Sequence, residues 1–128
     1  MSASVIYGIL KTNAAVTALV GTRIYKAQAK QFDSVPFIVY FKISTYPAQA
    51  KSGPSKLDTL RVQVSLYHSD GTAIDVLAET VRTALDRYSG TVGAYNVDSI
   101  SFLDDADNRD PDTKYYHIAQ DYQIRIKR

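Results

Sequence analysis

The clearest secondary-structure signal in this 128-residue chain is the stretch Leu60-Arg61-Val62-Gln63-Val64-Ser65-Leu66-Tyr67. Apolar and polar residues alternate strictly along it, which predicts a strand with one buried face and one face in water. Upstream, Pro36 opens a second predicted strand, Phe37 to Tyr46. The segment between them, Pro47 to Lys56, contains Gly53-Pro54 and predicts a long turn. Together these segments predict a long hairpin.

Helical spacing of apolar residues predicts helices on both sides of this hairpin. One helical region covers residues 4–20, with a break and a second cap at Thr12-Asn13 and a stop at Gly21, and a short extended piece, residues 23–25, follows it. Another helix runs from about residue 72 to 88 with Ser69 or Asp70 as its cap, and its apolar residues at helical spacing are Ile74, Leu77, Ala78, Val81 and Leu85. Two further strands are predicted at 97–103 and 116–127. The predicted fold is α+β in the order α-β-β-α-β-β. It has a mostly antiparallel sheet of about four strands, with two main helices packed on one face.

Composition limits the class of protein. With 45% hydrophobic and 22% charged residues, the chain is expected to form a single domain over residues 1–128. It has no cysteine, which excludes a disulfide scaffold, a thiolate metal site and a cysteine nucleophile. No apolar stretch is long enough to span a membrane, and the N-terminus lacks the basic leader of a secretory signal. We therefore expect a small soluble domain with no membrane partner.

Charge is distributed unevenly along the chain. Residues 1–64 hold eight Lys or Arg and two Asp, whereas residues 65–128 hold seven Lys or Arg and eleven Asp or Glu. Opposite charge on two faces of a subunit favours head-to-tail association into a ring. The alternative is that folding mixes both halves over the surface, so that no charged face remains.

Residues that could carry catalysis are scarce. His68 and His117 lie in or at the end of predicted strands, and no G-x-S-x-G motif accompanies them. Two histidines without cysteine do not make a zinc site. The glycines form no phosphate-binding pattern, since Ser89 to Gly93 follows a helix and reads as a turn. We therefore expect no enzymatic activity, no catalytic residues, no cofactor and no metal.

An acidic segment is predicted as a loop before the last strand, and it contains Asp104, Asp105, Asp107, Asp110 and Asp112. Several carboxylates so close together could bind calcium, but the D-x-D-x-D-G pattern and its closing Glu are missing. A solvated or partner-facing charged loop is the favoured interpretation.

The aromatic set is ten tyrosines and four phenylalanines without tryptophan. Tyrosine tolerates half-wet positions, which suits the less apolar face of a sheet that packs against a neighbour. Tyr40, Tyr46 and Tyr67 could alternatively stack on the bases of single-stranded nucleic acid, but few basic residues accompany them. Protein contact is therefore favoured over nucleic-acid binding.

The order of these motifs resembles the tail-completion, or tail-terminator, proteins of long-tailed bacteriophages and prophages. The resemblance rests on Ala18 to Tyr25, Val35 to Tyr40 and Arg61 to Tyr67, on the helix with Leu77-Ala78 and Val81-Arg82, and on Asp121 to Ile124. It implies a virion protein, assembled in the bacterial cytoplasm, of which six copies form a ring on the head-proximal end of the tail tube. Such a ring stops tube polymerisation and presents a surface for head-tail joining.

The implied partners are further copies of this chain, the tail tube protein and a neck or connector protein, with DNA passing through the ring unbound. At the hairpin tip we expect partner contacts from Gln49, Lys51, Ser52, Gly53 and Lys56, and in the acidic loop we expect ring contacts from the five aspartates. Three alternatives remain open: a neck or head-completion protein, a small single-stranded nucleic-acid-binding domain, and a small enzyme.

Overall fold

The predicted hairpin lies at the centre of the structure, a computed structural model that describes residues 4–26, 35–50, 53–109 and 115–127. Its two strands are β2 (Phe37–Ala50) and β3 (Gly53–His68). β6 (Tyr116–Lys127) pairs with β3, and β5 (Tyr95–Arg109) pairs with β6. Two short strands, β1 (Ile24–Lys26) and β4 (Gly90–Val92), lie at the edges of a six-stranded sheet of order β1-β2-β3-β6-β5-β4.

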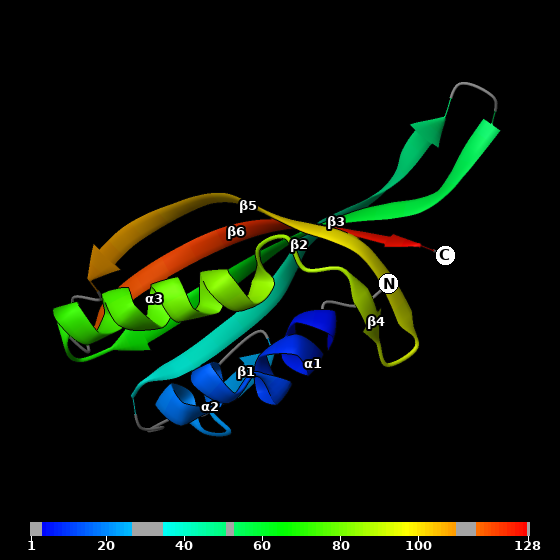
Figure 1. Cartoon of the computed structure of the whole chain (residues 1–128). Coiled ribbons are helices and arrows are strands. Elements are labelled where there is room, and N and C mark those ends of the chain that lie inside the picture. Colours follow the sequence, from blue (N-terminus) through cyan, green and yellow to red (C-terminus); the bar gives the residue numbers. More distant parts are fainter. Residues whose placement is uncertain (1–3, 27–34, 51–52, 110–114, 128) are drawn as a thin grey trace.

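Three helices lie together on one side of the curled sheet (Figure 1). They are α1 (Ser4–Thr12), α2 (Ala14–Val20) and α3 (Gly71–Leu85). The predicted caps are confirmed: Asn13 Oδ1 accepts the Val16 N–H at 3.1 Å, and Asp70 Oδ1 accepts the Thr72 N–H at 2.9 Å. Gly21 ends α2 with a φ of 62°, a left-handed conformation that favours glycine. Within the described ranges, no helix is long and apolar enough to cross a membrane.

The core lies between these helices and the sheet. The predicted inward face of β3 is confirmed, because Leu60, Val62, Val64 and Leu66 are all fully buried. From α3 the core receives the residues that helical spacing predicted, namely Ile74, Leu77, Ala78, Val81 and Leu85. Burial of this continuous apolar layer is the main source of stability.

The strand count and order differ from the prediction. The sheet has six strands and is mixed, because β1 runs parallel to β2 with Ile24 opposite Ile38. The element order is α-α-β-β-β-α-β-β-β, with three helices where two main ones were expected. The short extended piece expected at residues 23–25 is confirmed as β1, whereas β4, with only three residues, is too short for alternation to reveal a strand. The predicted turn at residues 89–93 is also wrong, because β4 occupies residues 90–92.

Two predicted loops are largely strand. The expected turn from Pro47 to Lys56 is wrong, because β2 continues to Ala50 and β3 begins at Gly53. Proline is tolerated there because this end of the hairpin is a two-stranded ribbon, in which each strand has one edge without a partner strand. The expected acidic loop is also wrong, because β5 extends to Arg109 and pairs with β6 throughout.

The sheet order places the two halves of the chain side by side. Strands β1 to β3, from the N-terminal half, form one lateral half of the sheet, and β4 to β6 form the other. The β2–β3 and β5–β6 pairings each have two register shifts, and one shift of each pairing lies at a matching place, at Ile43 in β2 and at Leu103 in β5. Both bulges adjoin a single cross-strand row, which runs Lys42, Val62, Tyr122, Phe102.

Candidate interaction surfaces

The far end of the β2–β3 hairpin projects from the body of the protein (Figure 1). β6 accompanies β3 only as far as Leu57, which lies opposite Lys127. Beyond it, the two hairpin strands pair only with each other in the described structure, with Gln49 opposite Pro54 and Ala50 opposite Gly53. This projection therefore extends past the part of the sheet in which β6 pairs with β3.

The predicted tip residues lie on this projection where the structure describes them. Gln49 is in β2, and Gly53 and Lys56 are in β3. Lys51 and Ser52 lie outside the described residues. The hairpin geometry therefore brings Gln49, Gly53 and Lys56 to the projecting segment, as the sequence suggested.

Three of the five predicted acidic residues lie along strand β5 rather than in a loop. Asp104, Asp105 and Asp107 are exposed on β5, and Asp110 and Asp112 lie outside the described residues. Cross-strand partners share a face, so Asp104 projects on the side of Asp121 and Asp105 on the side of Gln120. Among the described residues, no group of three His, Asp or Glu side chains could hold a metal ion, so calcium gains no support from this geometry.

Charge remains separated after folding, because the basic and acidic halves of the sequence occupy different halves of the sheet. On the β1–β2 side, Lys26 and Lys42 are exposed. The β5 side carries the exposed aspartates of that strand. β5 carries three exposed aspartates, Asp104, Asp105 and Asp107, and one exposed arginine, Arg109, so its exposed charge is negative on balance, whereas the exposed charges of β1 and β2 are basic.

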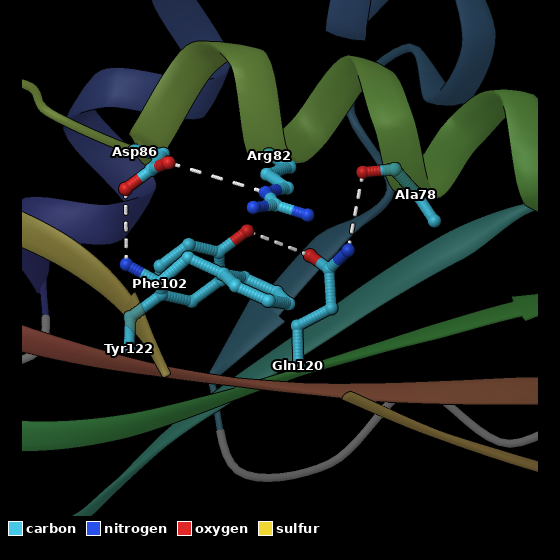
Figure 2. A network of polar contacts seen from close by, with 6 residues as sticks. All are labelled: Ala78, Arg82, Asp86, Phe102, Gln120 and Tyr122. Atoms are coloured by element: carbon cyan, nitrogen blue, oxygen red, sulfur yellow. Dashed lines mark hydrogen bonds and ion pairs between the residues drawn. The ribbon is translucent and has the colours of Figure 1, made fainter. Parts of the chain in front are cut away.

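A polar network joins the end of α3 to β5 and β6 (Figure 2). Buried Gln120 donates from Nε2 to the Ala78 carbonyl at 3.1 Å, and its Oε1 accepts the Tyr122 hydroxyl at 2.8 Å. Burial raises the pKa of the Tyr122 hydroxyl far above its ordinary value, and the nearby Asp86 carboxylate adds to that effect. The sequence did not reveal Gln120, because a glutamine among apolar positions gives no signal of its partners.

The other part of this network fixes the outer edge of β5. Asp86 Oδ1 accepts the Phe102 N–H at 3.0 Å, and the Arg82 guanidinium lies 4.0 Å from the centre of the Phe102 ring. The Phe102 ring in turn meets the edge of Tyr122 at a centroid distance of 5.6 Å. The network therefore holds β5 in place beside α3, which makes it a structural feature rather than a reactive centre.

An aromatic row crosses the face of the sheet away from the helices. Tyr67 stacks between Phe37 and His117, with ring centroids 4.8 and 4.4 Å apart, and Tyr25 adjoins Phe37 at 6.4 Å. Tyr40 was expected on this outer face, but it is 5% exposed and belongs to the core. Both faces of the Tyr67 ring are covered by neighbouring rings, so it offers no free face for base stacking.

A hollow of about 400 Å³ lies between α1 and the β4–β5 turn. Three tyrosines, two threonines and Lys11 line it together with small and apolar residues. Its lining in the described chain includes no carboxylate or histidine beside these hydroxyls. The projecting hairpin and the two sheet edges are the candidate surfaces for contact with other proteins.

Comparison with known proteins agrees with this interpretation. Residues 4–127 match the protein family described as tail completion protein gp17. Among solved structures, the chain is similar to one in the virion of a native gene transfer agent particle. The TM-score is 0.80 and the identity 18%, covering 96% of this chain and 92% of that one, which shows a shared fold. A search of curated proteins finds no match.

Proposed function

The chain belongs to the tail completion protein gp17 family, and from this premise we propose that it closes the head-proximal end of a phage tail tube. Family membership gives it a role in virion tail assembly. We assign that role to residues 1–128 acting as one domain, whose core and sheet extend over the described residues. The proposed action is structural: the bound protein ends tube polymerisation and provides the surface to which the neck or connector of the head joins.

Six copies form a ring in this proposal. The observation that carries it is the separation of charge between the two lateral halves of the sheet. A closed ring requires two different and complementary faces on each subunit, because each copy meets its neighbours head to tail. A basic edge and an acidic edge on one sheet supply such a pair of faces.

The projecting hairpin supplies a further contact, with the tail tube or the neck protein. It extends past the last β6 partner of β3, so its outer end is available to a surface beyond the ring itself. Gln49, Gly53 and Lys56, together with Lys51 and Ser52, remain the proposed contact residues. DNA passes through the ring without specific binding.

Light scattering tests the ring. Mass measured across protein concentration and salt should approach six subunits, and it should fall as salt rises, because salt screens the exposed charges that attract neighbouring copies. A mass that stays at one subunit at every concentration, both alone and with tail tubes present, would exclude the ring.

A shortened hairpin tests the contact with partners. Residues 48–55 are replaced by a two-residue Asn-Gly turn, which suits a hairpin connection. The shortened protein should keep its fold and its mass, since the removed segment extends beyond the rest of the sheet, but tail joining should be lost. Normal joining by this variant would contradict the assigned role of the tip.

A further inference from the structure

We propose that neighbouring copies meet edge to edge, the β2 edge of one against the β5 edge of the next, with Ile43 and Leu103 at the centre of the contact. The inference rests on the proposed ring and identifies the surfaces that form it. Four features of the sheet support it: the uncovered strand edges, the bulges, the charges and the strand directions.

The first feature is the open part of each edge strand. β1 pairs with β2 only at Ile38 to Tyr40, and β4 pairs with β5 only at Tyr95 to Val97. The turn after α3 covers β5 a little further, at Ile100, where backbone bonds join it to residues 87 and 88. Past Phe41 in β2 and past Phe102 in β5, no other strand of the described residues pairs with the outer edge. Such an edge is a template for another chain.

The second feature is the pair of bulges. Ile43 and Leu103 are each 45% exposed, although both are large apolar residues within strands. Each lies at a register shift, Ile43 directly after Lys42 in β2 and Leu103 directly after Phe102 in β5. Each has one charged neighbour in its strand, Lys42 beside Ile43 and Asp104 beside Leu103, and an exposed apolar residue next to a charge matches a protein interface with an apolar centre and a polar rim.

The third feature is charge complementarity. Lys26 and Lys42 are exposed on the helix side of the β1–β2 edge, since they lie opposite Tyr40 and Val62. Asp105 and Asp107 are exposed on the helix side of β5, where they lie opposite Gln120 and Ile118. The same row ends at exposed Arg109, opposite Tyr116, so its charge is negative on balance. Two β2 edges, or two β5 edges, would bring like charges together, whereas unlike edges attract. The occupant of each edge is therefore a second copy presenting its other edge.

The fourth feature is strand direction. β2, β3, β6 and β5 alternate in direction, because each neighbouring pair is antiparallel. The β5 strand of one copy therefore runs antiparallel to the β2 strand of a copy placed beside it in the same orientation. Repeated head-to-tail placement gives the same antiparallel β5–β2 contact at every junction, and a rotationally symmetric ring likewise repeats one contact between all its neighbouring copies.

Cysteine cross-linking tests this contact, because the chain has no cysteine of its own. Ile43→Cys and Leu103→Cys are made as single variants, and Val76→Cys, at an equally exposed apolar position on α3, is the control. A short bismaleimide is added to each variant alone and to equal mixtures. We expect a doubling of mass only in the mixture of Ile43→Cys with Leu103→Cys, and a ladder of larger species when one chain carries both changes.

The outcomes separate this inference from the proposed ring. If light scattering shows a ring but residues 43 and 103 do not cross-link, the edge contact is wrong and the ring stands. Cross-linking of either single variant to itself, or of Val76→Cys as efficiently as the pair, also overturns the contact. If no assembly forms and no cross-link appears, both the ring and the edge contact fail.

Discussion

The hydroxyl of Tyr122 donates a 2.8 Å hydrogen bond to Oε1 of Gln120, and both side chains are buried between α3 and the sheet. Gln120 also donates to the carbonyl of Ala78 at 3.1 Å. A glutamine inside an apolar core is tolerated only while its amide is satisfied. The bond to Ala78 connects β6 to α3, and the bond from Tyr122, within β6, satisfies the other end of the amide.

Removal of the Tyr122 hydroxyl should destabilise the fold. Tyr122→Phe leaves Gln120 Oε1 without this donor inside the core, and the expected loss is about 1–3 kcal/mol of unfolding free energy. Chemical denaturation measures the loss. The matched control is Tyr116→Phe, at a tyrosine 37% exposed, which should change stability by less than about 0.5 kcal/mol. Equal effects of the two changes would contradict the structural role of the network.

The same tyrosine should make the protein sensitive to alkali. Its pKa is raised in the folded state above the ordinary value of 10.0, so the unfolded chain ionises first as pH rises. The stability that this difference contributes is fully present below about pH 10 and is lost as pH increases above it. Unfolding free energy measured from pH 8 to 11 should therefore fall more steeply in the wild type than in Tyr122→Phe. Parallel curves would show that burial does not hold this hydroxyl protonated.

Two adjacent residues of α3 test the assignment of its buried face. Leu77 is 1% exposed and Val76 is 53% exposed. Leu77→Ala should cost about 2–5 kcal/mol, because it removes core contacts and leaves a cavity. Val76→Ala should stay within about 0.5 kcal/mol. Thermal and chemical unfolding of both variants measures the contrast, and a reversed order would mean that the helix is rotated about its axis.

Gly8 allows α1 to approach β4 closely. A Cβ built on Gly8 would lie 2.6 Å from Cγ1 of Val92, so the helix or the strand would have to move. Gly8→Ala should therefore destabilise by about 1–3 kcal/mol in spite of the better helix propensity of alanine. Combining it with Val92→Ala should recover most of that loss. Stabilisation by Gly8→Ala alone would show that the two elements are further apart than described.

Local patterns predicted the parts of the fold in which a short segment contains its own signal. The alternation of residues 60–67 identified the buried face of β3, and the Asn13 and Asp70 caps marked the starts of two helices. The strand at residues 104–109 was missed, since aspartate is rare in strands and is tolerated here at an exposed sheet edge.

Features that depend on pairing between distant segments could not be predicted. Ile43 and Leu103 are exposed because of register shifts, which are defined only once a partner strand is in place. Tyr40 and Tyr67 were both expected on the outer face, but the register places Tyr40 beside Val64 in the core and Tyr67 beside Phe37 outside. The uneven charge was visible in the sequence, but only the topology places strands β1 to β3 and strands β4 to β6 in separate halves of the sheet.

The most direct test of the proposed function is electron microscopy of tubes polymerised from the partner tail tube protein, with and without this protein. If the protein closes the tail tube, we expect shorter tubes that each carry a six-fold ring at one end and no longer elongate when more tube protein is added. Tubes of unchanged length that keep growing, with no ring at either end, would contradict it.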